Sequence, residues 1–429
     1  MSTIAVVGCF DTKGHEHAFV ADRIRSLGHT PLLIDTGTTD APQVPVDIRV
    51  TEILPAFSLP GDRGRCVAEI AAAVGPFVSR LAADGRIDGI VSLGGGGGTS
   101  IGTAAMRSLP LGIPKVMVST LASGNTAPYV GTSDIVMMPS IVDVAGLNRL
   151  SRSIFTAAAH AVCGMVEARQ AAAADTAHDG KPLIVASMFG NTTACVAEAT
   201  AALEAAGYEV LTFHATGTGG RTMESLIASG MVAGVLDITT TEIADELCGG
   251  VLSAGPTRLE AAGLARLPAI VVPGCVDMVN FGPRESLPPE FEGRLLYEHN
   301  DQVTLMRTTA EENRRIAAFI AEKLNAYPVP PTVLLPLKGV SVISAEGGAF
   351  FNPEADRALF ETLASRLSQQ IRLVESEHAI NDPEFARLCA RELITLLEHR
   401  ASSQGHAPST ETSRLFPESA RRFAAVRQR

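Results

Sequence analysis

IDGIVSLGGGGGTS, residues 87–100, joins an apolar run to five consecutive glycines. The apolar half predicts a buried β-strand, and the apolar pattern of residues 101–109 predicts a helix directly after the glycines. Each ordered glycine costs roughly 0.5–1 kcal/mol relative to alanine, and a tight turn needs only one or two. Bare backbone N–H groups before a helix N-terminus attract an anion. We therefore predict a phosphate or carboxylate site here, with a flexible surface loop as the alternative. The residues of this predicted site are Gly94, Gly95, Gly96, Gly97, Gly98 and Thr99.

The composition bounds the class of protein. A chain of 429 residues suggests two domains. Hydrophobic residues make up 46% and aromatic residues only 5%, which is typical of an α/β protein rich in small aliphatic side chains. The formal charge of −11 argues against a general nucleic-acid or anionic-membrane surface. Seven cysteines without a C-x-x-C pair, and no apolar run long enough to span a bilayer, predict a cytoplasmic protein with reduced thiols.

Apolar strands alternate with helical patterns along the chain, which predicts an α/β fold with mostly parallel sheets. The predicted strands are residues 4–9, 32–35, 87–93, 116–119, 183–187, 210–214, 232–238, 270–273 and 333–336. A helix over 146–169 is followed by residues 170–180, which lose the apolar period, so we place a domain boundary near 178. The domains expected are 1–178 and 179–400, with 401–429 as a polar tail.

The two halves repeat short patterns. LGH at 27–29 matches AGY at 206–208, and PKVMV at 114–118 matches PAIVV at 268–272. This duplication predicts two related, doubly wound (Rossmann-like) lobes. TTTE at 239–242 stands where the first half has its glycines, so the two clefts are expected to bind different ligands.

Three loops of the first half follow strands, and ligands of open α/β sheets bind beyond the carboxyl ends of the strands. Loops 8–14 and 119–126 are therefore expected to converge on the glycine run. Their candidate residues are Asp11, Thr12 and Lys13 in the first loop and Thr120, Ser123, Gly124 and Asn125 in the second. Together they supply a cation, a carboxylate, hydroxyls and backbone donors, which suit a polyphosphate.

The glycine run matches neither common phosphate-binding motif. No Gly-Lys-Ser/Thr closes it as in a Walker A loop, and Thr99 stands at the last position of G-x-G-x-x-G. Lys13 is the candidate substitute for the missing lysine. An exposed lysine at Lys13, a helix cap at Asp11 and turn-closing roles for Ser123 and Asn125 remain open alternatives.

The second half is richer in acid–base groups. The candidate catalytic residues are His214, Cys275, Asp277 and His299, each close to the end of a predicted strand or to a helix start. One cleft containing all four would bind a metal or pair a cysteine nucleophile with a histidine base. None has diagnostic spacing, so core, turn-capping and half-buried structural roles stay open, and the identity of any metal is unknown.

Five segments together resemble a known family. They are 94–99 (GGGGGT), 214–220 (HATGTGG), 273–277 (PGCVD), 305–308 (LMRT) and 335–341 (LPLKGVS). Over residues 1 to about 400 the chain resembles the ATP-binding domain family named for the tobamovirus-resistance protein of tomato, which includes uncharacterised bacterial members. The resemblance implies a two-lobed α/β domain that binds ATP with Mg²⁺ and forms a homodimer or higher homo-oligomer. In the plant protein a barrel-like domain follows, so a separate barrel-fold protein is an expected partner.

Three functions therefore remain open. The leading hypothesis is an ATP-binding protein whose first-lobe loops hold the phosphates, with the reaction unknown. The second is an enzyme acting on a small carboxylate, sugar-acid or phosphorylated metabolite in the second-lobe cleft. The third is a nucleotide-gated interaction module. Whether the protein is an enzyme is left undecided, and neither a nucleic acid nor a membrane is expected as a partner.

Overall fold

The computed structural model describes residues 1–37, 40–55, 62–174 and 180–403. The chain divides into two compact units, Met1–Asp179 and Gly180–Arg429, called here the N-terminal and C-terminal lobes. The boundary predicted at 178 and residues 404–429 of the predicted tail lie outside the described residues. Residues 401–403 continue the last helix instead of belonging to a tail.

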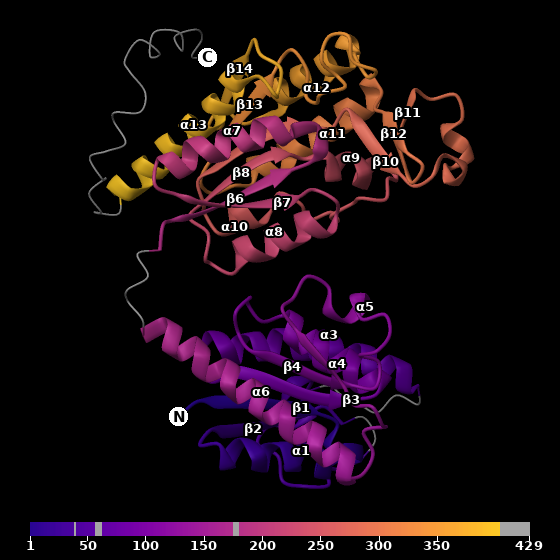
Figure 1. Cartoon of the computed structure of the whole chain (residues 1–429), viewed down its shortest axis with the longest axis vertical. Helices are drawn as coiled ribbons and strands as arrows, with labels where there is room; N and C mark the ends of the chain where they lie inside the picture. Colours follow the sequence, from indigo (N-terminus) through magenta and orange to yellow (C-terminus); the bar gives the residue numbers. More distant parts are fainter. Residues whose placement is uncertain (38–39, 56–61, 175–179, 404–429) are drawn as a thin grey trace. The chain divides into compact units, whose positions relative to one another are not determined.

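The N-terminal lobe is an open parallel sheet with helices on both faces (Figure 1). Its strands are β1 (Thr3–Gly8), β2 (Thr30–Asp35), β3 (Gly89–Gly94), β4 (Lys115–Ser119) and β5 (Val136–Pro139), in the order β2-β1-β3-β4-β5. Its helices are α1 (Phe10–Ser26), α2 (Val50–Ile53), α3 (Arg63–Ala83), α4 (Gly96–Arg107), α5 (Ala127–Val130) and α6 (Arg149–Ala174). Helices α1 and α6 pack in one apolar core against the sheet, and α3 and α4 pack in a second core on the other face.

The C-terminal lobe repeats this plan on a larger scale. The strands of its parallel sheet are β6 (Leu183–Met188), β7 (Glu209–His214), β8 (Gly234–Thr239), β9 (Ala269–Gly274), β13 (Thr332–Pro336) and β14 (Arg372–Ser376), in the order β7-β6-β8-β9-β13-β14. A separate antiparallel sheet contains β10 (Met278–Phe281), β11 (Leu296–Asn300) and β12 (Val303–Arg307). The helices are α7 (Thr193–Ala205), α8 (Thr218–Ala228), α9 (Thr241–Cys248), α10 (Ala261–Leu264), α11 (Ala310–Asn325), α12 (Pro353–Arg366) and α13 (Pro383–Ser403).

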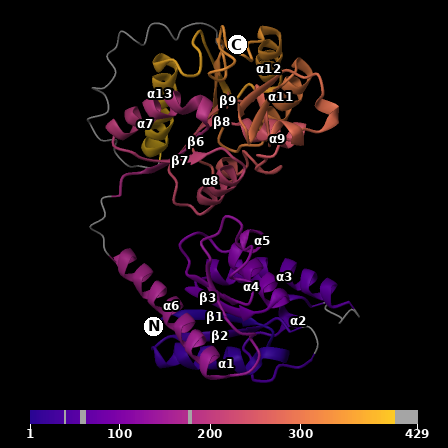
Figure 2. The ribbon, with the colours of Figure 1, turned by 45° about the vertical axis from the view of Figure 1, so that its right-hand side comes forward.

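One face of the larger sheet carries the main core of the C-terminal lobe. Helices α7 and α13 pack there on β6, β8, β9 and β13 through side chains that are almost entirely buried. Figure 2 shows α9, α11 and α12 on the other side of the strands from α7 and α13. The start of α11 is fixed by a capping box, in which the Thr309 side chain accepts a hydrogen bond from the Glu312 N–H.

The α/β prediction with two parallel-sheet lobes is confirmed. Five strands of each lobe follow the same order, since β2-β1-β3-β4-β5 corresponds to β7-β6-β8-β9-β13. In both lobes the order reverses between the first and third strands of the lobe, which creates the crevice where ligands of such sheets bind. The antiparallel sheet and the edge strands β5 and β14 were not predicted, because their short segments show no clear apolar alternation.

Helix α3 differs from the expectation that no apolar segment of the chain is long enough to span a bilayer. Its segment Gly64–Ala83 is long and apolar enough to cross a bilayer by length and composition, and 33% of it is buried inside the lobe. Its apolar side, including Ile70, Val74 and Val78, packs in the second core of the N-terminal lobe.

Candidate functional site

The glycine run is the first turn of α4. The helix begins at Gly96 with Gly95 as its N-cap, not at residue 101 as predicted. The Thr99 N–H already donates to the Gly95 carbonyl at 2.8 Å. Helix geometry leaves the preceding N–H groups of the first turn without helical acceptors. The run therefore presents the open N-terminus of a 12-residue helix, which favours an anion.

Packing explains some of these glycines but not all. A Cβ on Gly94 would lie 2.7 Å from the Gly98 Cα, and one on Gly97 would lie 3.3 Å from the side chain of Val67. By contrast, a Cβ on Gly96 would meet nothing within 4 Å, and one on Gly95 would meet only the Thr120 hydroxyl, at 3.7 Å. At Gly95 and Gly96, therefore, packing within the protein leaves room for a side chain, although both positions are glycine.

A polar pocket of about 390 Å³ lies beyond the carboxyl ends of β4 and β5 in this lobe. Its lining includes Ser119, Thr120, Ser123, Ser140 and Asp143. The buried Thr99 hydroxyl lies 2.7 Å from the Ser119 hydroxyl, which ties the glycine run to the β4 loop. Thr99 therefore positions two loops of the site, and Ser140 and Asp143 are site candidates that sequence reasoning missed.

The β4 loop divides the predicted residues by role. Thr120 and Ser123 are exposed and line the pocket. Asn125 closes a turn, because its Oδ1 accepts the Ala127 N–H at 3.2 Å. Gly124 donates its N–H to the Leu121 carbonyl at 3.0 Å in the same loop.

The β1 loop occupies the neighbouring position, since β1 pairs with β3. Lys13 is partly buried in the first turn of α1, where its φ of −132° kinks the helix. Thr12 is exposed. Asp11 is buried against the β2 loop, because a Cβ on Gly37 would lie 2.8 Å from its Cγ. Of these three residues, Lys13 and Thr12 remain candidates for a ligand, whereas Asp11 packs on the β2 side.

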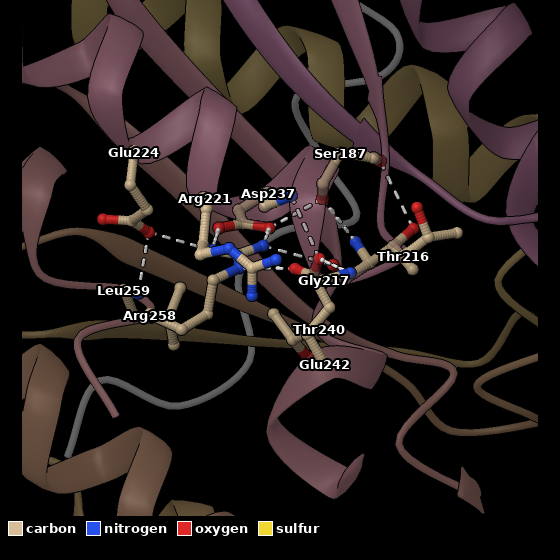
Figure 3. Close-up of polar contacts among 12 residues, drawn as sticks. Ser187, Thr216, Gly217, Arg221, Glu224, Asp237, Thr240, Glu242, Arg258 and Leu259 are labelled. Atoms are coloured by element: carbon tan, nitrogen blue, oxygen red, sulfur yellow. Dashed lines mark hydrogen bonds and ion pairs between the residues drawn. The ribbon is translucent and has the colours of Figure 1, made fainter. Parts of the chain in front are cut away.

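The C-terminal lobe holds a buried ion cluster around Arg258 (Figure 3). The guanidinium donates to both carboxylate oxygens of Asp237, at 2.5 and 2.7 Å, and through Nε to Glu242 at 2.8 Å. It also lies 3.2 Å from Glu224, whose pKa is raised by burial. The carboxylates raise the pKa of Arg258 well above its usual value despite burial. Arg258 is only 1% exposed, and its ion pairs connect β8, α8 and α9 inside the lobe.

Glu242 also fills the glycine loop of this lobe. Its Oε1 accepts the N–H groups of Gly217 at 2.7 Å and Gly220 at 3.0 Å, at the start of α8 (Figure 3). A Cβ on Gly220 would lie 2.0 Å from Glu242 Oε2, and one on Gly219 would lie 1.8 Å from the His214 carbonyl oxygen. Packing therefore requires these glycines, and the protein's own carboxylate occupies the N-terminus of α8.

Cys275 and Asp277 lie together in the loop after β9. Both are fully buried, and the Ser341 hydroxyl donates to Asp277 Oδ2 at 2.8 Å. Burial raises the pKa of Asp277 to about 6. Burial, with the nearby Asp277 carboxylate, raises the pKa of the Cys275 thiol well above its usual value. A thiol of this kind is poorly suited to be a nucleophile.

The two histidines stand on other elements than this pair. His214 is exposed at the end of β7 and packs edge-on against the ring of Phe189, with centroids 5.4 Å apart. His299 is exposed at a register shift in β11, a strand of the antiparallel sheet. Within the described ranges no group of three His, Cys, Asp or Glu side chains is arranged to hold a metal ion.

Sequence reasoning missed Arg258 and its partner Asp237. Arg258 stands in a loop that has no motif, so nothing local marks it. Asp237 is different, because it interrupts the apolar strand GVLDIT of residues 234–239. Charged side chains are almost never fully buried unless they are paired, so a carboxylate inside a buried strand could have predicted a buried cation.

Fold and site define a two-lobed, doubly wound α/β protein whose first lobe has a glycine-rich helix N-terminus beside a polar pocket. The chain belongs to an uncharacterised protein family, UPF0261, whose N-terminal domain matches residues 2–171 and C-terminal domain residues 181–397. It is 49% identical over 403 residues to a UPF0261 protein of Clostridium tetani, covering 92% of this chain and 99% of that protein. It is 45% identical over 327 residues to the ToMV resistance protein Tm-1(GCR237) of Solanum lycopersicum, covering 76% of this chain and 43% of that protein.

Among solved structures, the chain is similar to a UDP-N-acetylglucosamine 2-epimerase from Rickettsia bellii. The match covers 94% of this chain and 97% of that chain, at 11% identity and a TM-score of 0.21. At this level the similarity carries no argument about function.

Proposed function

We propose that the N-terminal lobe binds ATP, with the phosphates on the open N-terminus of α4. The observation that carries the proposal is that Gly95 and Gly96 are bare although packing leaves room for a side chain at both positions. Backbone N–H groups at a helix N-terminus bind phosphates well. The adjoining pocket, lined by hydroxyls, supports the same ligand class, and Lys13 is the candidate cation from the neighbouring loop. The choice of ATP over another phosphorylated compound rests on the family resemblance of the sequence.

Mg²⁺ is part of this proposal. Asp143 lines the pocket and is exposed, as are the Thr120 and Ser123 side chains. Carboxylate and hydroxyl oxygens, with water and phosphate oxygens, are the ligands that Mg²⁺ prefers. These residues fit a bound magnesium ion, which would neutralise phosphate charge next to the glycine run.

Calorimetry of MgATP binding to a Gly96→Asp variant tests the proposal. Aspartate adds bulk and negative charge where the phosphates would lie, so we expect affinity to fall at least about ten-fold, equivalent to about 1.4 kcal/mol. An aspartate in the first turn of a helix is itself stabilising by roughly 0.3–1 kcal/mol, so misfolding would not explain the loss.

Gly164→Asp is the matched control. Gly164 lies on the exposed side of α6 in the same lobe, and a Cβ there also meets nothing within 4 Å. This variant carries the same added charge and is expected to bind MgATP as the wild type does. Equal affinity in the wild type and Gly96→Asp, or no binding to the wild type, would refute the site.

A further inference from the structure

The C-terminal lobe contains a second, larger pocket, of about 820 Å³. It lies beyond the carboxyl ends of β13 and β14, and one face of α12 forms a wall. Figure 1 shows β13, β14 and α12 in the C-terminal part of this lobe. Small-molecule sites typically have volumes of about 300–1,000 Å³, and the carboxyl edge of an α/β sheet is where they form. None of the residues predicted from the sequence as catalytic lines this pocket.

The lining carries charged side chains of both signs. Lys338 and Arg357 are exposed cations, and Glu346, Glu361 and Glu375 are exposed carboxylates. Within the part of the chain that the structure describes, no ion pair or side-chain hydrogen bond engages any of these five groups. Asp356, at the inner wall, is instead paired with the buried Arg307 at 2.6 Å.

The pocket also has an apolar surface. Phe351 is 47% exposed, and Phe360 and Leu337 line the same volume. An exposed aromatic ring beside a pocket is a common anchor for an apolar or aromatic group of a ligand. A ligand with a single charge sign would leave either the two cations or the three carboxylates without a counter-charge.

We infer that this pocket binds a zwitterionic small molecule of about dipeptide size, with an apolar body between an amine and a carboxylate. Arg357 and Lys338 hold the carboxylate, Glu361 and Glu375 hold the amine, and Phe351 packs against the body. The site belongs to the C-terminal lobe and does not depend on the nucleotide site proposed above.

Calorimetry with three forms of one probe tests the charge requirement: the dipeptide alanyl-phenylalanine, its N-acetyl form and its C-terminal amide. The zwitterion is expected to bind saturably, and loss of either end charge is expected to weaken binding at least about ten-fold. No saturable binding of the zwitterion, or equal binding of all three forms, would overturn the inference.

Two variants then assign the ends. Arg357→Gln should weaken binding of the zwitterion and should make the affinities for the dipeptide and its C-terminal amide equal. Glu361→Gln should instead make the affinities for the dipeptide and its N-acetyl form equal. The matched controls are Arg366→Gln and Glu354→Gln, exposed residues of α12 that do not line the pocket. If the control variants weaken binding as much as Arg357→Gln and Glu361→Gln do, the assignment fails.

Discussion

In the N-terminal lobe, Gly95 and Gly96 stand before open space at the start of α4. In the C-terminal lobe, the glycines of residues 214–220 pack tightly, and the carboxylate of Glu242 accepts the N–H groups of Gly217 and Gly220. The two lobes share a strand order, yet one leaves a helix N-terminus open and the other fills it with its own anion.

The contrast shows that a glycine-rich loop is not by itself a ligand site. What matters is whether the backbone N–H groups already have an acceptor and whether a Cβ would fit. By both criteria Gly95 and Gly96 remain available to an external anion, whereas the loop at 214–220 is completed internally by a buried carboxylate held on Arg258.

Removing the internal anion should have the largest effect. Glu242→Ala leaves two buried N–H groups and one side of Arg258 unpaired, so we expect the C-terminal lobe to lose about 3–5 kcal/mol of stability. Hydrogen exchange of α8 amides measures this loss. Glu204→Ala, an exposed position on α7, is the control and should change stability by less than about 0.5 kcal/mol. A loss no greater than that of the control would contradict the role of Glu242.

The interior carboxylates of the C-terminal lobe should also make its stability depend on pH. Asp245 accepts both donors of Asn280, at 2.6 and 2.8 Å, and burial raises its pKa from 3.8 to about 7. Between these values the folded state holds a proton that the unfolded chain has lost. Stability contributed by Asp245 is therefore full below pH 3.8 and falls as pH rises to about 7.

Asp245→Asn tests this dependence. In unfolding experiments, the variant should lack the decrease in stability that Asp245 contributes as pH rises. In the wild type this decrease is expected to be about 1.4 kcal/mol for each unit by which the pKa is raised. If the variant and the wild type show the same slope between pH 4 and 7, the raised pKa of Asp245 is wrong.

A pair of alanine substitutions sharpens the comparison further. Gly220→Ala places a Cβ 2.0 Å from a buried oxygen of Glu242, so we expect a loss of about 1–3 kcal/mol. Gly96→Ala meets no neighbour and lies at the first helical position, so we expect a gain of about 0.4–1 kcal/mol. In thermal unfolding, the stability changes of the two variants should have opposite signs. Changes of the same sign would contradict the difference in packing between the two glycine loops.

A similarly small effect is expected at Asn125. Its Oδ1 closes a turn with the Ala127 N–H, so Asn125→Ala should cost about 0.5–1.5 kcal/mol of stability. MgATP affinity should not change, whereas Ser123→Ala, at the pocket, should lower it. An unchanged stability with weakened MgATP binding would instead make Asn125 a ligand contact.

Local patterns predicted most of the fold. Apolar runs located the inner strands of both parallel sheets. The start of α4 was misplaced because glycine has the weakest helix propensity among ordinary residues, so a helix beginning at Gly96 has no local mark. The grouping of His214 and His299 with Cys275 rested only on their positions near strand ends or a helix start, which do not determine which side chains meet.

The buried network was beyond reach for a different reason. Arg258 meets Asp237, Glu242 and Glu224 only after three separate elements have packed together. Neighbours distant in sequence, such as Val67 beside Gly97, also decide whether a glycine position has room for a side chain. The sequence shows how many glycines each loop has. Only the packed structure distinguishes the open loop at 94–98 from the loop at 214–220, which Glu242 fills.

Hydrogen exchange along the whole chain, with and without MgATP, tests the central contrast most directly. We predict that MgATP slows exchange in residues 94–107 and 119–125 and leaves residues 214–228 unchanged, because Glu242 already occupies that helix N-terminus. Slowed exchange confined to residues 214–228, or no change in 94–107, would contradict the account.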